Sequence, residues 1–405
     1  MTTTYMLEGQ QARAMGRGPV AIYMLTALCE GFDVQAAGVA ATGILGELHC
    51  TPAELGLFFS ASGIGLMIGS VVGGGIADRR GRKLVLVASI GAFGGFSLLT
   101  AVMPSLPLLA VARFLTGLGL GGAIPSLLAM AFENSAPEGS NRNLGIAYIG
   151  MPIGGSLVSL LAFLIPSTAW RELFWVGGLI PLLIVPALMY FLPDARGANP
   201  PTSRESGLAS GSRQILEKGR RTQTLLLWIS FFLIVLTLHL MLNWLPFLLK
   251  ARGLSKDAAM LAQAAFGMGG ALIALGQAAL LDSSWRWRST VISIGVLPLI
   301  LICAALIPAW PATLTLTALL LGGSILAQQV IVYSAGSVCY SKEGRGIGLG
   351  AAVAVGRVGS IAGPLFAAVL LASGRDASQV LLGMLPIVLA CGVFVGLASR
   401  TKYSK

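Results

Sequence analysis

Long apolar stretches separated by short polar segments make up most of the chain. Each runs for about 20 residues or more, which is the length that an α-helix needs to cross a bilayer. Apolar residues follow one another without the strict alternation that marks the strands of a membrane barrel. The pattern therefore predicts membrane-spanning helices, at roughly 19–44, 53–77, 84–103, 106–132, 143–165, 172–192, 224–249, 258–281, 289–308, 312–336, 346–372 and 379–398.

A polar stretch rich in Pro, Ser and Gly divides these segments into two sets of six. Such a composition is typical of a flexible linker. We therefore expect an N-terminal six-helix half over residues 1–193, a cytoplasmic central loop over 194–223 and a C-terminal six-helix half over 224–405. The expected fold is an all-α membrane protein with twelve transmembrane helices in two pseudo-symmetric halves.

A faint internal repeat agrees with this division. An Asp and an Arg four residues apart end the second helix of each half, as Asp78 with Arg82 and as Asp282 with Arg286. Parallel six-helix repeats are the construction of one large class of transporters.

Composition supports a membrane protein and narrows its chemistry. Hydrophobic residues make up 55% of the chain and charged ones only 11%, with a mean hydropathy of +0.83. Soluble domains carry about a quarter charged residues. The five cysteines form no C-x-x-C pair, and no phosphate-binding loop, H-E-x-x-H or G-x-S-x-G pattern occurs. We therefore expect no metal or other cofactor, and we disfavour an enzyme or a transporter driven directly by ATP.

The net charge of +11 is explained by membrane topology rather than by nucleic-acid binding. If the N-terminus lies inside, 20 of the 27 Lys and Arg residues fall in cytoplasmic segments and 5 in outer loops. Cytoplasmic loops carry such an excess of basic residues. The distribution predicts that both termini and the central loop are cytoplasmic.

Four ionisable side chains interrupt the apolar helices: Glu30, Asp33, Arg113 and Arg357. A charge at the bilayer centre costs about 2.5–3.5 kcal/mol on insertion scales, and such residues are functional by default. A guanidinium holds a carboxylate in bidentate fashion, and a carboxyl group in a low-dielectric interior can bind and release a proton. We expect the arginines to receive an anionic substrate and the acids to couple protons. A charge network that only locks helices together is the alternative.

Several neutral groups are weaker candidates. His239 is either a second proton carrier or a neutral histidine that bonds across helices. Further polar residues either bond a ligand or join helices, and aromatic ones either stack on a ring or pack. The candidate substrate contacts are Tyr148, Asn243, Gln328, Gln329 and Tyr333.

The stretch from Gly74 to Lys83 resembles the signature of the major facilitator superfamily between helices two and three. In that family the motif holds a cytoplasmic gate, with its Asp paired to basic residues and to a helix end. The resemblance implies a gate role for the matching positions Gly74, Asp78, Arg79, Gly81, Arg82 and Lys83.

Glu30-Gly31-Phe32-Asp33 is similar to the Asp-Gly-x-Asp motif of the aromatic acid:proton symporters, with Glu in the place of the first Asp. This resemblance implies import of an aromatic carboxylate, a hydroxyphenylpropionate or a related phenylpropanoid or benzoate acid, with a proton. By position, Glu30 and Asp33 would couple protons, while Arg113 and Arg357 would bind substrate or complete that network. Further similar stretches are 113–119, 243–246 and 354–359.

The sequence thus predicts a proton-coupled importer of the bacterial inner membrane that works as a monomer in lipid. Its expected partners are the small aromatic acid and protons, without nucleic acid. Two alternatives stay open: an exporter of drugs or metabolites with the same fold, and a membrane-bound sensor of aromatic acids. The central stretch is short for the signalling domain that a sensor requires.

Overall fold

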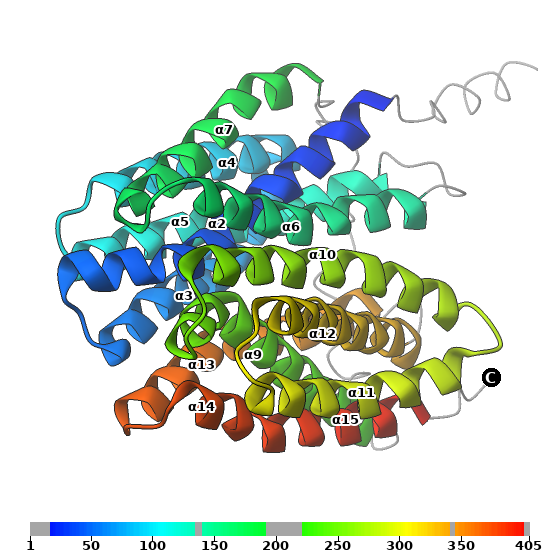
Figure 1. Ribbon diagram of the computed structural model, residues 1–405. Coiled ribbons are helices and arrows are strands. Elements are labelled where there is room, and N and C mark those ends of the chain that lie inside the picture. The colour runs from blue at the N-terminus through cyan, green and yellow to red at the C-terminus, as the bar shows by residue number, and fades with distance from the viewer. Residues whose placement is uncertain (1–16, 134–139, 192–220, 341–344, 401–405) are drawn as a thin grey trace, which may run out of the picture.

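The computed structural model describes residues 17–133, 140–191, 221–340 and 345–400. Of these residues, it leaves out the side chains of 17–23, Asp78, 124–133, 140–148, Phe191, Val338, 345–346 and Arg400. Within these ranges the chain is helical and contains no β-strand (Figure 1). Ten of the helices are long and apolar enough to cross a membrane on described residues alone. In two more, α2 and α6, the first side chains lie outside the description. The expected all-α membrane fold is confirmed.

The helices follow the predicted apolar stretches closely. The first half comprises α2 (Arg17–Leu48), α3 (Pro52–Arg80), α4 (Arg82–Val102), α5 (Leu106–Glu133), α6 (Ser140–Leu164) and α7 (Trp170–Phe191). The second comprises α9 (Arg221–Ala251), α10 (Lys256–Leu281), α11 (Arg286–Leu306), α12 (Pro311–Cys339), α13 (Arg345–Ala372), α14 (Ala377–Gly383) and α15 (Leu385–Arg400).

The last predicted helix, 379–398, is interrupted between α14 and α15. Pro386 has no N–H to donate to the preceding turn, so an uninterrupted helix would lack one backbone hydrogen bond there. The chain turns at Met384, whose N–H donates to the carbonyl of Leu381 over 3.1 Å. The two pieces together still make a single apolar span.

Glycines bring the second and fourth helices of each half into backbone contact. In the first half, a Cβ on Gly117 of α5 would lie 2.1 Å from the carbonyl oxygen of Ser62 on α3. In the second, a Cβ on Gly322 of α12 would lie 2.0 Å from the carbonyl oxygen of Phe266 on α10. Small residues allow helices to approach this closely. These are the second and fourth helices of each half, which agrees with the predicted repeat.

The two halves pack against each other through α2, α3 and α6 on one side and α9, α10 and α13 on the other (Figure 1). Gln35 Nε2 donates to the carbonyl of Leu242 over 3.3 Å, and Ser60 Oγ to the carbonyl of Ile361 over 2.9 Å. Gln35, Leu242 and Ile361 lie in the C-terminal halves of their helices, and Ser60 lies in the N-terminal half of α3, which runs in the opposite direction. These contacts therefore lie towards the same end of the bundle.

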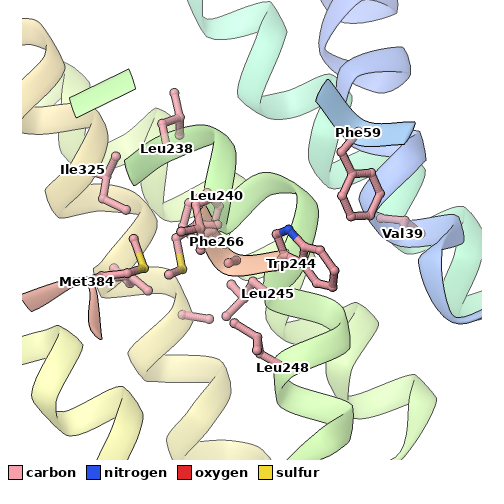
Figure 2. Packing of buried hydrophobic residues seen from close by; sticks show 14 of the residues in the cluster. Val39, Phe59, Leu238, Leu240, Trp244, Leu245, Leu248, Phe266, Ile325 and Met384 are labelled. Carbon is pink, nitrogen blue, oxygen red and sulfur yellow. The ribbon is translucent and has the colours of Figure 1, made fainter. Parts of the chain in front are cut away.

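Further contacts between the halves lie at the same end. Ser156 Oγ donates to the carbonyl of Ala264 over 2.9 Å, and Lys256 Nζ donates to the carbonyl of Ile165. Figure 2 shows Phe59 of α3 facing Trp244 of α9, and their ring centroids are 5.2 Å apart in an edge-to-face arrangement. The halves are therefore held together tightly at the end formed by the C-terminal part of α2 and the start of α10.

The predicted gate motif forms a sharp turn between α3 and α4. Gly81 has φ +95°, which side-chain-bearing residues rarely adopt, and its N–H donates to the carbonyl of Ala77 over 3.0 Å. Arg79 is exposed, whereas Arg82 and Lys83 are half-buried. Gly74 lies in α3 one turn before Asp78, whose side chain is outside the described part.

Candidate functional site

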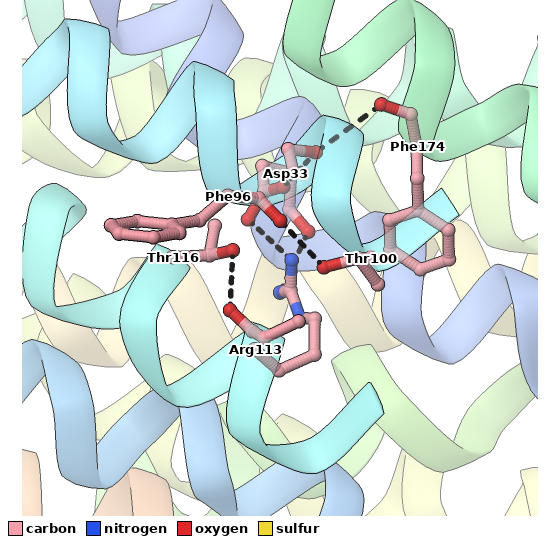
Figure 3. A network of polar contacts seen from close by, with 8 residues as sticks. Asp33, Phe96, Thr100, Arg113, Thr116 and Phe174 are labelled. Carbon is pink, nitrogen blue, oxygen red and sulfur yellow. Dashed lines mark hydrogen bonds and ion pairs between the residues drawn. The ribbon is translucent and has the colours of Figure 1, made fainter. Parts of the chain in front are cut away.

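Asp33 and Arg113 form an ion pair that is completely enclosed in the first half. Arg113 Nη1 lies 2.7 Å from Asp33 Oδ2, and the side chains are 1% and 0% exposed respectively. Figure 3 shows the guanidinium of Arg113 on α5 directed at the carboxylate of Asp33 on α2. The two charges therefore satisfy one another away from water and from lipid.

Further hydrogen bonds surround this pair, although the buried Nε of Arg113 has no hydrogen-bond partner among the described residues. Ser97 Oγ of α4 lies 3.1 Å from Asp33 Oδ1 and 3.3 Å from the carbonyl oxygen of Phe174 on α7. Arg113 Nη2 also donates to the backbone carbonyl of Asp33 over 3.2 Å, and the guanidinium lies 5.7 Å from the centre of the Phe174 ring. Four helices of the first half thus meet at Asp33.

A cavity of about 140 Å³ lies between the two halves. Helices α2, α3 and α6 line it from one side, and α9, α10, α12 and α13 from the other. A cavity shared by both halves is where a transporter built from repeats holds its substrate. It is lined by Ala27, Glu30, Gly31, Val34, Gln35, Leu66, Met151, Pro152, Gly155, Phe231, Val235, Leu238, His239, Leu242, Phe266, Gly267, Leu326, Gln329, Tyr333, Val353, Gly356 and Arg357.

Glu30 supplies the carboxyl group of this cavity and Arg357 its guanidinium. They come from different halves and are close enough to interact electrostatically. Glu30 is only 5% exposed, and its Oε1 atom has no hydrogen-bond partner among the described residues. A buried carboxyl oxygen without a partner is costly, so this atom is placed to receive a proton or a ligand group.

The candidates divide into those that reach the cavity and those that do not. Gln329 and Tyr333 line it, whereas Arg113 and Asn243 are not among its lining residues. Asn243 Nδ2 donates to the carbonyl of His239 on its own helix over 2.7 Å. Gln328 Nε2 donates to the carbonyl of Ser293 over 3.0 Å, which joins α12 to α11. Tyr148 cannot be placed, because its side chain lies outside the description.

Sequence reasoning missed part of the cavity wall. Phe231 and Tyr333 meet edge to face with centroids 4.9 Å apart, and Phe266 of α10 lines the same cavity. Tyr333 was among the sequence candidates, but nothing in the pattern separates Phe231 and Phe266 from aromatic residues that only pack. Gln35 could have been identified as a cavity residue, because it is a polar residue in the same apolar run as Glu30.

The family model described as Major Facilitator Superfamily matches residues 23–364. The chain belongs to this superfamily. Among curated relatives, the 3-(3-hydroxy-phenyl)propionate transporter of Escherichia coli (strain K12) is 36% identical over 95% of this chain and 94% of the relative. The 4-hydroxybenzoate transporter PcaK of Pseudomonas putida is 31% identical over 94% of this chain and 92% of the relative.

Solved structures of superfamily members have the same fold. The crystal structure of a D-xylose-proton symporter is 15% identical, with a TM-score of 0.78 over 93% of this chain and 96% of that one. A bacterial homologue of the lysosomal transporter Spinster gives a TM-score of 0.76 at 15% identity, over 94% of this chain and 96% of that one. The family match and the curated relatives confirm the prediction of a multi-pass membrane transporter rather than an enzyme.

Proposed function

We propose that this protein carries an aromatic carboxylate into the bacterial cell together with a proton. The observation that carries the proposal is the cavity between the halves, which combines one guanidinium, one carboxyl group and several aromatic rings. A substrate with a carboxylate at one end and an aromatic ring at the other matches that combination. The names of the relatives agree, since they include transporters of hydroxyphenylpropionate, 4-hydroxybenzoate and gallate.

Arg357 is the proposed anchor of the substrate carboxylate. It is the cationic residue among those that line the cavity, whereas the guanidinium of Arg113 is already engaged by Asp33. The family resemblance implied two possible roles for Arg113, namely substrate binding or completion of the proton-coupling network. We therefore assign Arg113 to the network.

Replacing Arg357 by glutamine is expected to weaken the binding of the aromatic acid strongly. Truncating one partner of a desolvated charge pair costs about 2–5 kcal/mol, which is about 30-fold or more in affinity. Binding of radiolabelled acid to detergent-purified protein measures it. Arg288→Gln serves as the control, because Arg288 is exposed and stacks on Trp285 outside the cavity. Wild-type affinity in Arg357→Gln would remove this residue from the proposed site.

Glu30 is the proposed site at which the proton meets the substrate. While Glu30 is ionised it competes with the substrate carboxylate for Arg357, and its protonation releases the guanidinium. Asp33 lies one helical turn away in the first half, where its ion pair joins α2 to α5. A change in the charge of Glu30 would reach Asp33 through the shared helix α2.

The contacts between the halves support a cycle of alternating access. They close the cavity at the end that the distribution of basic residues places outside, so release would occur past the α3–α4 turn. Gly74, Asp78, Arg79, Gly81, Arg82 and Lys83 would hold that side closed in the opposite state. In this proposal both termini lie in the cytoplasm, and a single chain provides the whole pathway.

Uptake by reconstituted vesicles tests the proposal directly. Vesicles containing the protein should accumulate radiolabelled 3-(3-hydroxyphenyl)propionate or 4-hydroxybenzoate when the outside is made acidic. A protonophore should abolish the accumulation, and empty vesicles provide the background. Accumulation that is indifferent to the gradient would remove the proton from the proposal, and accumulation only under the reversed gradient would indicate an exporter.

A further inference from the structure

His239 lines the cavity, and one of its two ring nitrogens is already hydrogen-bonded within its own helix. Its Nδ1 atom lies 3.1 Å from the carbonyl oxygen of Val235, one turn earlier on α9. A carbonyl can only accept, so Nδ1 carries a proton. In the neutral ring Nε2 is then an acceptor, and it makes no hydrogen bond among the described residues.

The position of His239 relative to Arg357 suits a substituted ring. A Cβ on Gly356 would lie 3.3 Å from Val235 Cγ2, which places the start of the Arg357 side chain level with Val235. His239 is four residues further along α9, about 6 Å along its axis. That separation is comparable with the width of a benzene ring.

The remaining wall between these two positions is mainly apolar. Leu238, Phe266 and Leu326 line the same cavity as His239 and Arg357. A ring whose carboxylate is held by Arg357 would be surrounded by these side chains, with its far edge towards the imidazole. A hydrogen-bond donor on that edge would meet an acceptor, whereas an unsubstituted ring would leave Nε2 without a partner at a cost.

We propose that His239 is a specificity-determining residue that accepts a hydrogen bond from a phenolic hydroxyl of the substrate. The inference rests on the proposed function and deepens it, because it makes the substrate class hydroxylated aromatic acids. It also assigns His239 to recognition rather than to proton transfer. The positive charge of the cavity is supplied by Arg357, and the imidazole acts in its neutral form.

A comparison of the uptake of three acids tests this assignment. The probes are 3-(3-hydroxyphenyl)propionate, 3-phenylpropionate, which lacks the hydroxyl, and 3-(3-methoxyphenyl)propionate, which has the oxygen but no donor. KM for uptake into vesicles under an inward proton gradient is measured for the wild type, His239→Leu and His239→Gln. Thr237→Val is the control, because Thr237 is buried in α9 outside the cavity and bonds only its own helix.

The wild type and the control should prefer the hydroxylated acid over both others by about tenfold in KM, as one neutral hydrogen bond allows. His239→Leu should bring the ratio close to one, and His239→Gln, which retains an acceptor, should restore a preference. An unchanged ratio in His239→Leu overturns the assignment while leaving the proposed function intact. Loss of gradient-driven accumulation of all three acids in His239→Gln would also overturn it, by showing a proton carrier. A wild type that carries none of these acids overturns the proposed function itself.

Discussion

Replacing Arg113 by alanine is expected to destabilise the protein by about 3–5 kcal/mol, the cost of removing one partner of a buried ion pair. Asp33 would be left as a carboxylate with 0% exposure and without its 2.7 Å partner. Ser97 is a single hydroxyl donor and cannot replace a guanidinium. Thermal unfolding of the purified protein in detergent measures the loss, and a low yield of folded protein is expected to accompany it.

Arg171→Ala is the matched control for this prediction. Arg171 pairs with Glu47 near the surface, where the two side chains are 27% and 43% exposed. Exposed pairs contribute about 0–1 kcal/mol, so this variant should unfold close to the wild type. Wild-type stability in Arg113→Ala would contradict the enclosed pair that the structure shows.

The double variant Asp33→Asn with Arg113→Leu separates stability from transport. Because it removes both charges, it should recover much of the stability that either single change loses. If Asp33 takes part in proton coupling, the double variant should fold but fail to accumulate substrate. Accumulation at the wild-type level would show instead that the pair only holds helices together.

The helices could be predicted from the sequence because membrane spans need continuous apolar runs, and little else fixes their approximate bounds. The partners of the charged residues could not be predicted from the sequence. Positions three apart on a helix differ by about 60° around its axis, so Glu30 and Asp33 can share a helix and still meet different neighbours. The structure directs Glu30 into the cavity and Asp33 towards Arg113. That outcome depends on which helices pack together, and the spacing does not encode it.

The neighbouring residues Gln328 and Gln329 show the same limit. Consecutive helical positions point about 100° apart, so the two amides face different surroundings. Gln329 lines the cavity, whereas Gln328 is buried against α11. The sequence identifies α12 as a helix that carries polar groups, but only the rotation of that helix decides which group meets a ligand.

Replacing Glu30 by glutamine is expected to uncouple transport from the proton gradient. Glutamine has nearly the shape of a protonated glutamic acid, cannot ionise, and leaves Arg357 free to hold the substrate carboxylate. Exchange of labelled for unlabelled substrate across the membrane needs no net proton movement, and it should therefore continue. Glu54→Gln is the control, because Glu54 is an exposed acid at the start of α3 and glutamine preserves its capping role.

The most direct test of the account compares exchange and accumulation in the same Glu30→Gln vesicles. We expect these vesicles to exchange labelled 3-(3-hydroxyphenyl)propionate but to accumulate at least about tenfold less of it under an inward proton gradient, whereas Glu54→Gln should accumulate fully. Accumulation by Glu30→Gln at the wild-type level would contradict the claim that proton and substrate meet at Glu30 and Arg357.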